Sequence, residues 1–210
     1  GFSTWTRGLS WAMLGFAEQL EFLQSQENFP ELDELGGRNH LKEIFLKAAK
    51  ATCDFYIENP ALDGIPYWDT GAPGLVNLPN WQEVKSDPFN DFEPIDSSAA
   101  AIGAQGLLRL GSYLKKEKSS DAYKYWSAGL TVANTLFDEP YLSANPEHQG
   151  LILHSIYHRP NGWDHIPENN KIPNGEACMW GDYHARELAH YLNEVIMGES
   201  YYTFFKGITS

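Results

Sequence analysis

Apolar residues recur at the spacing of an α-helix along much of the chain, and they predict five long helices. The first helix covers about residues 4–24, with Ser3 or Thr4 as its N-cap. The second covers about residues 40–58, and Pro60 stops it because proline cannot continue a helix. The apolar positions of the second helix follow the helical period closely: Leu41, Ile44, Phe45, Ala48, Thr52, Phe55 and Tyr56.

Three further helices are predicted in the second half of the chain. The third begins at Asp96, Ser97 or Ser98, and the basic run 115–118 suits its C-terminal end. The fourth starts at Ser119 or Ser120 and closes before Pro140, and the fifth starts near Trp180. Residues 201–205 could begin a sixth helix. The glycines of the third helix predict a close approach to a neighbouring helix.

Two long inserts separate the helices, at residues 61–95 and 141–174. Both are rich in proline, glycine or polar residues and are too long to serve only as connectors, which favours a functional rim or lid. No alternation of strands and helices is present. The pattern predicts an all-α fold of antiparallel helix pairs in a single helical domain, residues 1–210.

Composition narrows the possible partners and compartments. The formal net charge of −13 argues against nucleic acid and anionic membranes as partners. No apolar run is long enough to span a bilayer, so we expect a soluble protein of the bacterial cytoplasm or periplasm. Cys53 and Cys178 have no metal-like spacing and predict two free thiols, with one disulfide as the alternative. Aromatic residues make up 14% of the chain, which suits either sugar stacking or a large core.

Two tryptophans bracket an arginine at the start of the first helix. Arg7 and Trp11 are four residues apart and share one helix face, and Trp5 lies just before them. An arginine held between indoles can bind a carboxylate by its charge while the rings stack on a sugar. The alternative is an ordinary core helix in which the arginine extends past two packed tryptophans.

Polar and aromatic side chains are concentrated in the loop at residues 153–165. His154 and His158 could bind a metal with Asp164 or His165 as a third ligand, but no tight ligand motif is present, so we predict no metal. Tyr157 and His158 fit better as hydrogen-bond donors to a polyhydroxylated ligand. A loop that only packs on the core is the remaining alternative.

Two aspartates are candidates for acid–base chemistry. Asp69 follows Tyr67 and Trp68, an apolar setting that suits a general acid. Asp96 stands at a helix start, where N-capping is the more common role of aspartate. Nucleophile-elbow and phosphate-loop motifs are absent from the sequence.

Several motifs, in order along the chain, resemble glycoside hydrolase family 88, the unsaturated glucuronyl hydrolases. The first is Ser-Thr-Trp-Thr-Arg-Gly-x-x-Trp at residues 3–11, of which the family 105 unsaturated rhamnogalacturonyl hydrolases keep a similar form. Each motif alone is weak, but together they span nearly the whole chain. The others are Pro-Tyr-Trp-Asp at 66–69, Asp-Ser-Ser-Ala-Ala-Ala-Ile at 96–102, Leu-His-Ser-Ile-Tyr-His-Arg-Pro at 153–160 and Trp-Gly-Asp-Tyr at 180–183.

The resemblance implies an (α/α)₆ toroid of about twelve helices, of which this chain resembles the C-terminal half. It implies removal of a Δ4,5-unsaturated uronic acid from the non-reducing end of oligosaccharides that a lyase has produced. In that family an aspartate protonates the vinyl ether, water adds to the far carbon, and the hemiketal opens by itself. The resemblance implies neither a metal nor an organic cofactor.

Carried over by position, Trp5, Arg7 and Trp11 match residues of the sugar and carboxylate pocket. Tyr157 and His158 match a loop beside the subsite beyond the cleaved bond. The family's catalytic aspartates lie upstream of the tryptophan–arginine motif, so they are expected upstream of Gly1.

Because the positions of the catalytic aspartates are not included in this sequence, we predict that activity requires an N-terminal half, in the same protein or in a second chain. Leu9 also replaces a glutamine that is common in the family. An unsaturated rhamnogalacturonyl hydrolase and a non-catalytic helical domain that binds uronic-acid sugars are the alternatives.

Overall fold

The computed structural model describes residues 3–25, 30–173, 175–201 and 203. Within this described part the chain is all-helical, with isolated β-bridges but no strand, which confirms the predicted fold class. Five α-helices are separated by irregular segments that contain three short 3₁₀ turns. The helices are α1 (Thr6–Ser25), α2 (Arg38–Glu58), α3 (Ser97–Lys116), α4 (Ala122–Leu136) and α5 (Met179–Met197); the turns are η1 (Pro30–Leu35), η2 (Pro73–Asn77) and η3 (Arg159–Asn161).

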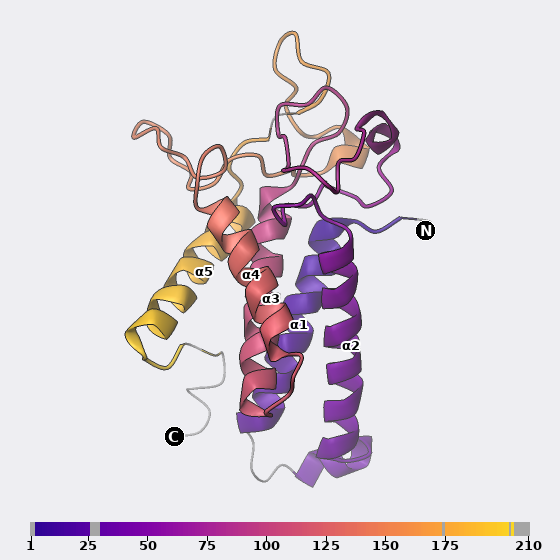
Figure 1. Ribbon diagram of the computed structural model, residues 1–210, viewed down its shortest axis with the longest axis vertical. Coiled ribbons are helices and arrows are strands. Elements are labelled where there is room, and N and C mark those ends of the chain that lie inside the picture. Colours follow the sequence, from indigo (N-terminus) through magenta and orange to yellow (C-terminus); the bar gives the residue numbers. More distant parts are fainter. Residues whose placement is uncertain (1–2, 26–29, 174, 202, 204–210) are drawn as a thin grey trace.

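The helices run antiparallel in chain order, and the two long inserts lie together at one end (Figure 1). Helices α1, α3 and α5 form one layer, because α3 contacts both of the others. Helix α2 packs against α1, and α4 packs against α3. Ion pairs at 2.7 and 2.8 Å, Lys50 to Asp121 and Lys124 to Asp54, join α2 to α4 in a second layer.

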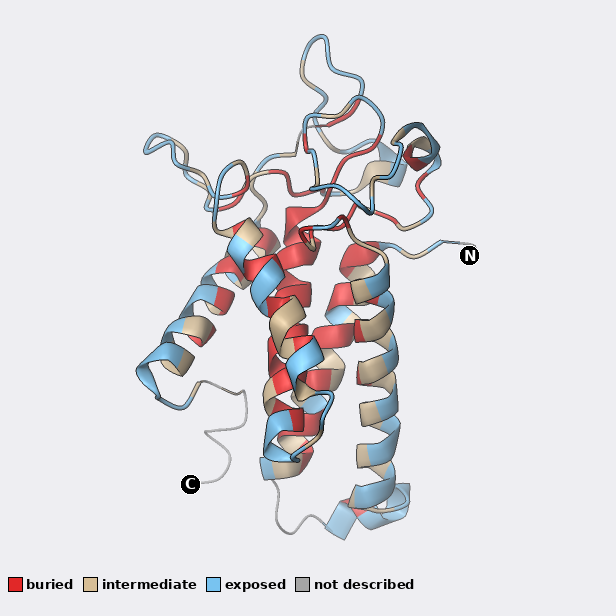
Figure 2. Cartoon of the chain, viewed as in Figure 1, coloured by how far each residue is buried: buried red, intermediate tan, exposed pale blue. Residues whose placement is uncertain are grey.

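Helix α3 is the core of the molecule. It is buried on nearly all sides, as Figure 2 shows, because its first two turns carry small residues that admit close neighbours. A Cβ added at Gly106 would lie 2.8 Å from the backbone nitrogen of Leu14 in α1. The predicted close approach of helices at the glycines of this segment is therefore confirmed.

The sequence-based helix bounds need small corrections. The first helix begins at Thr6, one to two residues later than Ser3 or Thr4 as N-cap would place it. The fourth begins at Ala122, not directly after Ser119 or Ser120. Asp96 is the N-cap of α3, as expected. The predicted sixth helix at residues 201–205 falls mostly outside the described residues.

The two cysteines are free thiols, so the alternative of a disulfide was wrong. Cys53 is buried in α2, whereas Cys178 precedes α5 and is partly exposed. Among the described residues, none of the helices combines the length and the apolar character that crossing a bilayer requires.

A charged cluster lies between α1, α3 and α5. Glu21 of α1 pairs with Arg109 of α3 at 2.8 Å, and both side chains are buried. Half-buried Glu18 stands one turn before Glu21. Burial raises the pKa of Glu18 to about 7; the Arg109 charge lowers it in part, while Glu21 and Glu187 raise it further. Between about pH 4.5 and pH 7, the folded chain therefore holds a proton on Glu18 that the unfolded chain releases.

We expect the protein to become less stable as pH rises, because folding then no longer gains from the proton bound to Glu18. The folded-state pKa of Glu18 is raised, so its contribution is intact below about pH 4.5 and is lost as pH rises to about 7. Glu18→Gln should therefore raise the free energy of unfolding by about 1 kcal/mol at pH 8, after allowance for partial exposure, and by much less at pH 5. Urea unfolding at both pH values measures this, with Glu43→Gln on the exposed face of α2 as the control. An equal gain at both pH values would contradict the expectation.

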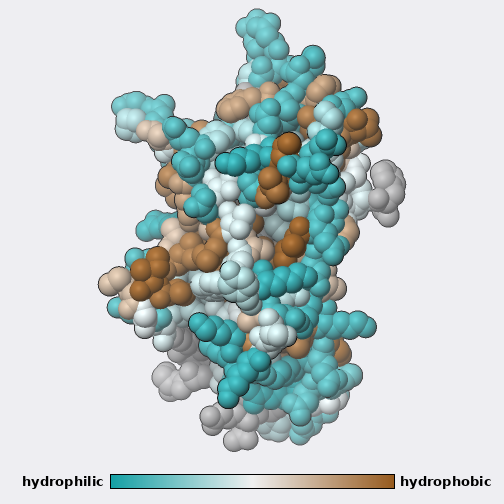
Figure 3. All heavy atoms as spheres, viewed as in Figure 1, coloured by the Kyte–Doolittle hydropathy of each residue, from teal (hydrophilic) through white to brown (hydrophobic). Residues whose placement is uncertain are grey.

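A broad groove separates the C-terminal parts of α4 and α5. It has a volume of about 930 Å³, and its lining includes Leu130, Phe137 and Leu192. Ile196, which also lines it, and neighbouring Met197 are well exposed. In the view of Figure 3, apolar atoms gather over this part of the molecule. An apolar face of this kind is uncommon on a monomeric protein.

Candidate binding site

The site is built where α1 meets the insert at residues 61–95. The insert pairs with the first residue of α1 and with the segment before it: Thr6 N donates to Trp68 O and Thr70 N donates to Thr4 O, both at 3.0 Å. The hydroxyl of Thr6 also donates to Tyr67 O at 2.7 Å. These bonds fix the start of α1 on the insert, so Trp5 has a defined position at the helix end.

Gly8 allows the indole of Trp5 to fold back over the first turn of α1. A Cβ at this position would lie 2.7 Å from the Trp5 ring, so a larger residue would displace it. Arg7 then lies beneath the indole, with its guanidinium carbon 5.0 Å from the Trp5 ring centre and 4.8 Å from that of Trp180. The predicted arrangement of an arginine between two indoles is present, but the second indole is Trp180 and not Trp11.

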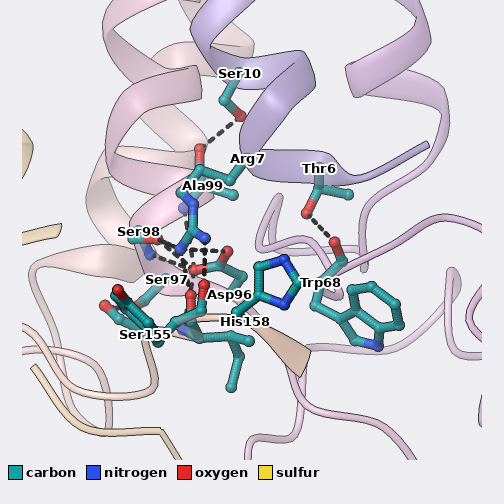
Figure 4. Close-up of polar contacts among 12 residues, drawn as sticks. Thr6, Arg7, Ser10, Trp68, Asp96, Ser97, Ser98, Ala99, Ser155 and His158 are labelled. Atoms are coloured by element: carbon teal, nitrogen blue, oxygen red, sulfur yellow. Dashed lines mark hydrogen bonds and ion pairs between the residues drawn. The ribbon is translucent and has the colours of Figure 1, made fainter. Parts of the chain in front are cut away.

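Arg7 is nearly fully buried and binds the loop that follows Ser155. One guanidinium nitrogen donates to Tyr157 O at 2.6 Å, and the other donates to Ile156 O and to Ser98 Oγ. Figure 4 shows the guanidinium directed at Asp96 and the start of α3. Arg7 therefore holds in place the backbone that carries Tyr157.

Asp96 completes this arrangement from the other side. One carboxylate oxygen accepts from Ser98 N at 3.0 Å and from Ile156 N at 3.3 Å, and the other lies 3.7 Å from Arg7. Burial raises the pKa of Asp96, and the Arg7 charge and the hydrogen bonds from Ser98, Ile156 and Ala99 oppose that shift. Asp96 thus caps α3, ties the loop to it and balances Arg7.

The loop at residues 157–164 closes on itself. The Asp164 carboxylate accepts hydrogen bonds from the backbone N–H groups of Tyr157 and His158. The His158 ring accepts from Asn161 N at 3.2 Å and caps the turn η3. These bonds hold Tyr157 and His158 at one edge of the site.

A pocket of about 340 Å³ lies between this loop and the start of α1. The structure brings three of the predicted site residues together around it: Trp5, Tyr157 and His158. Arg7 is not among the described lining residues: it is buried and donates to the backbone carbonyls of Ile156 and Tyr157, two residues that do line the pocket. The other lining residues are Ser3, Trp68, Asp69, Ile156, Arg159 and Pro160.

The structure places Trp11 elsewhere. It lies one turn further along α1, with its ring 6.3 Å from that of His184 in α5. Among the described residues that line the 340 Å³ pocket, Trp11 is not present. Both Trp11 and Trp5 are about half exposed, so neither is the packed core residue that the alternative interpretation requires.

The two histidines considered for a metal lie in different surroundings. His154 is buried, with Phe89 and Tyr141 packed edge-on at 5.1 and 5.9 Å. His158 is the cap of η3. In the part of the chain that the structure describes, no three His, Cys, Asp or Glu side chains gather as metal ligands would.

Sequence reasoning missed the roles of Trp180, Asp164 and Arg159. Trp180 was part of a motif, but nothing in its spacing predicts that it stacks on Tyr157 at 5.1 Å and covers Arg7. Asp164 was considered only as a metal ligand. Arg159 is a half-exposed cation in the pocket lining.

The pocket therefore combines aromatic faces, hydrogen-bonding side chains and the guanidinium of Arg159 at one end of a paired-helix array. Aromatic faces with a few polar groups and cations are suited to an anionic sugar. The fold and the site together define a helical domain with an aromatic, polar pocket at one end.

Comparison with known proteins confirms the predicted resemblance to unsaturated glucuronyl hydrolases, although no family model matches the chain. The chain is 28% identical to the unsaturated glucuronyl hydrolase of Formosa agariphila over 93% of its own length and 38% of the relative's. It is also 28% identical to that of a Bacillus species over 95% of its length and 42% of the relative's. The chain thus spans about two fifths of the curated relatives it matches.

Solved structures of unsaturated glucuronyl hydrolases are also similar to this chain. The Bacillus enzyme, described as responsible for the degradation of glycosaminoglycan, superposes with a TM-score of 0.65 and 27% identity, over 98% of this chain and 43% of that one. A Streptococcus agalactiae unsaturated glucuronyl hydrolase mutant, solved with dGlcA-GalNAc6S, has a TM-score of 0.59 at 20% identity. The paired helices are therefore part of an (α/α)₆ toroid, as predicted.

Proposed function

We propose that this chain supplies the C-terminal half of an unsaturated glucuronyl hydrolase. The reaction is removal of a Δ4,5-unsaturated uronic acid from the non-reducing end of a lyase-generated oligosaccharide, by hydration of its vinyl ether. The observation that carries the proposal is the pocket formed by Trp5, Tyr157 and His158 next to buried Arg7, within a chain similar to these enzymes over nearly its whole length.

The proposal places the catalytic acid outside this chain. General-acid catalysis requires a proton donor within hydrogen-bond reach of the reacting carbon. Asp96 is fully buried and engaged by α3, Ile156 and Arg7. Asp69 lines the pocket, but its carboxylate accepts from Gly71 N at 2.8 Å and shapes the turn of the insert. Both aspartates are assigned structural roles.

The direct test follows the ultraviolet absorbance of an unsaturated disaccharide, which falls when the double bond is hydrated. The chain combined with the remaining toroid helices should remove this absorbance. Absorbance that persists while the sugar binds would favour a non-catalytic binding domain. If only unsaturated rhamnogalacturonan fragments are turned over, the activity is that of the family 105 unsaturated rhamnogalacturonyl hydrolases.

Arg7 is the proposed partner of the uronate carboxylate. A charged hydrogen bond contributes roughly 1.5–3 kcal/mol, so Arg7→Ala in the active assembly should weaken binding of the acidic sugar by about 10- to 100-fold. A neutral analogue should lose less, namely the part that comes from release of the loop at Tyr157. Calorimetry with both sugars measures the difference.

Arg159→Ala is the matched control, because Arg159 is a cation that lines this pocket, whereas Arg7 lies outside the described lining. It does not hold the loop in the way that Arg7 does, so it should preserve the preference for the acidic sugar. Loss of the preference in Arg159→Ala, with its retention in Arg7→Ala, would assign the carboxylate to Arg159. Equal losses for both sugars in Arg7→Ala would restrict Arg7 to a structural role.

A further inference from the structure

The aromatic rings of the site form one continuous stack that reaches solvent at Trp163. The stack begins at Trp5 and Arg7 and continues through Trp180 to Tyr157, at the distances given above. The Trp163 ring follows, with its centre 5.5 Å from that of Tyr157 and a tilt of 34°. Trp163 is 60% exposed and the Trp5 ring at the other end is 47% exposed, whereas Arg7, between Trp5 and Trp180, is buried. The rings from Trp180 through Tyr157 to Trp163 therefore lead outward from Arg7, the proposed partner of the carboxylate.

Trp163 lies immediately outside the pocket. Its ring contacts Tyr157 and, at 5.0 Å, His158, and both of those residues line the pocket. Among the described lining residues Trp163 itself is not present. A ligand that extends out of the pocket past Tyr157 and His158 would next meet the indole of Trp163.

The indole is held in place before any ligand arrives. Trp163 lies directly before Asp164, whose carboxylate is fixed by the N–H groups of Tyr157 and His158. The backbone N–H of Trp163 donates to His158 O at 3.5 Å. An exposed tryptophan with two side-chain torsions and an anchored backbone offers a large contact area at low entropic cost.

We infer that Trp163 is the platform of an outer sugar subsite, which stacks on the sugar beyond the unit that Tyr157 and His158 contact. This inference rests on the proposed function and adds a preference for chain length. The protein should act better on unsaturated tetrasaccharides than on disaccharides, because only the longer ligand reaches the indole. The contact is uncharged, so it works within a protein whose net charge of −13 repels polyanions.

The test compares unsaturated hyaluronan disaccharide and tetrasaccharide in the assembly that turns over the disaccharide. Trp163→Ala should lower kcat/KM for the tetrasaccharide about fivefold, through KM, and leave the disaccharide within twofold. Trp163→Phe should retain most of the tetrasaccharide preference. Tyr123→Ala, which removes an exposed aromatic side chain from α4, is the control and should change neither value.

Equal losses on both substrates, or no loss on either, would overturn the subsite. If Trp163→Ala misfolds, Trp163→Leu takes its place: a reduced preference for the tetrasaccharide in Trp163→Leu supports the subsite, and an unchanged preference refutes it. If wild type turns over no unsaturated sugar, the proposed function fails separately. Calorimetric binding of the tetrasaccharide then decides, since weaker binding by Trp163→Ala than by Tyr123→Ala supports the platform and equal binding refutes it.

Discussion

Asp96→Ala is expected to lower the free energy of unfolding by about 3–5 kcal/mol, because it leaves the buried charge of Arg7 without its ion-pair partner. The same substitution removes the side-chain cap of α3 and the acceptor for Ile156 N, so the most buried helix loses its fixed start. Urea unfolding of the protein at pH 7 measures the loss.

Asp121→Ala is the matched control, since Asp121 is also an N-cap aspartate in an ion pair. It precedes α4, its side chain makes no capping hydrogen bond, and its pair with Lys50 is solvent-exposed. Exposed pairs contribute little, so the control should unfold close to wild type. Similar midpoints for Asp96→Ala and Asp121→Ala would show that the buried pair adds nothing to stability.

The second expected result is that the 210 residues alone turn over no unsaturated disaccharide. The pocket provides aromatic faces and the cation of Arg159, while the acid is proposed to lie upstream of Gly1. The apolar groove between α4 and α5, with Ile196 exposed, should also lead the isolated chain to associate. Absorbance assays with and without the upstream half measure the first effect, and light scattering measures the second.

Asp69→Asn tests the opposite result, in which the 210 residues are active and Asp69 is the catalytic acid. Full turnover by the 210 residues, abolished by Asp69→Asn, would make Asp69 the acid and would show that the positional transfer from the family is wrong. Turnover that appears only with both halves, and that survives Asp69→Asn, would support a composite site.

The helices could be predicted because each depends on local signals. The apolar period places α2 and α5, Pro60 ends α2, and Asp96 caps α3 through bonds to residues two and three positions later. The start of α1 was placed too early because it depends on a distant segment. Pairing with Trp68 and Thr70 extends the chain up to Trp5, and the capping preferences of Ser3 and Thr4 are overridden.

The site could be predicted only in part, for the same reason. Arg7 and Tyr157 could be named from their motifs, but the bond between them spans 150 positions of the chain. The pairing of Arg7 with Trp180, and the separation of Trp11 from the pocket, follow from how α5 packs on α3. No spacing within a single segment carries that information.

The alternation of helix direction also has an electrostatic consequence. Helices α1, α3 and α5 all begin at the end where the inserts lie (Figure 1), so their positive dipole ends lie at the end of the molecule that holds the pocket. Helices α2 and α4 end there and present negative dipole ends in the other layer. Across the rim the potential therefore rises from the α2–α4 layer toward the α1–α3–α5 layer. In a protein of net charge −13, the helix dipoles thus favour an anion near the first turns of α1, α3 and α5 over one near the last turns of α2 and α4.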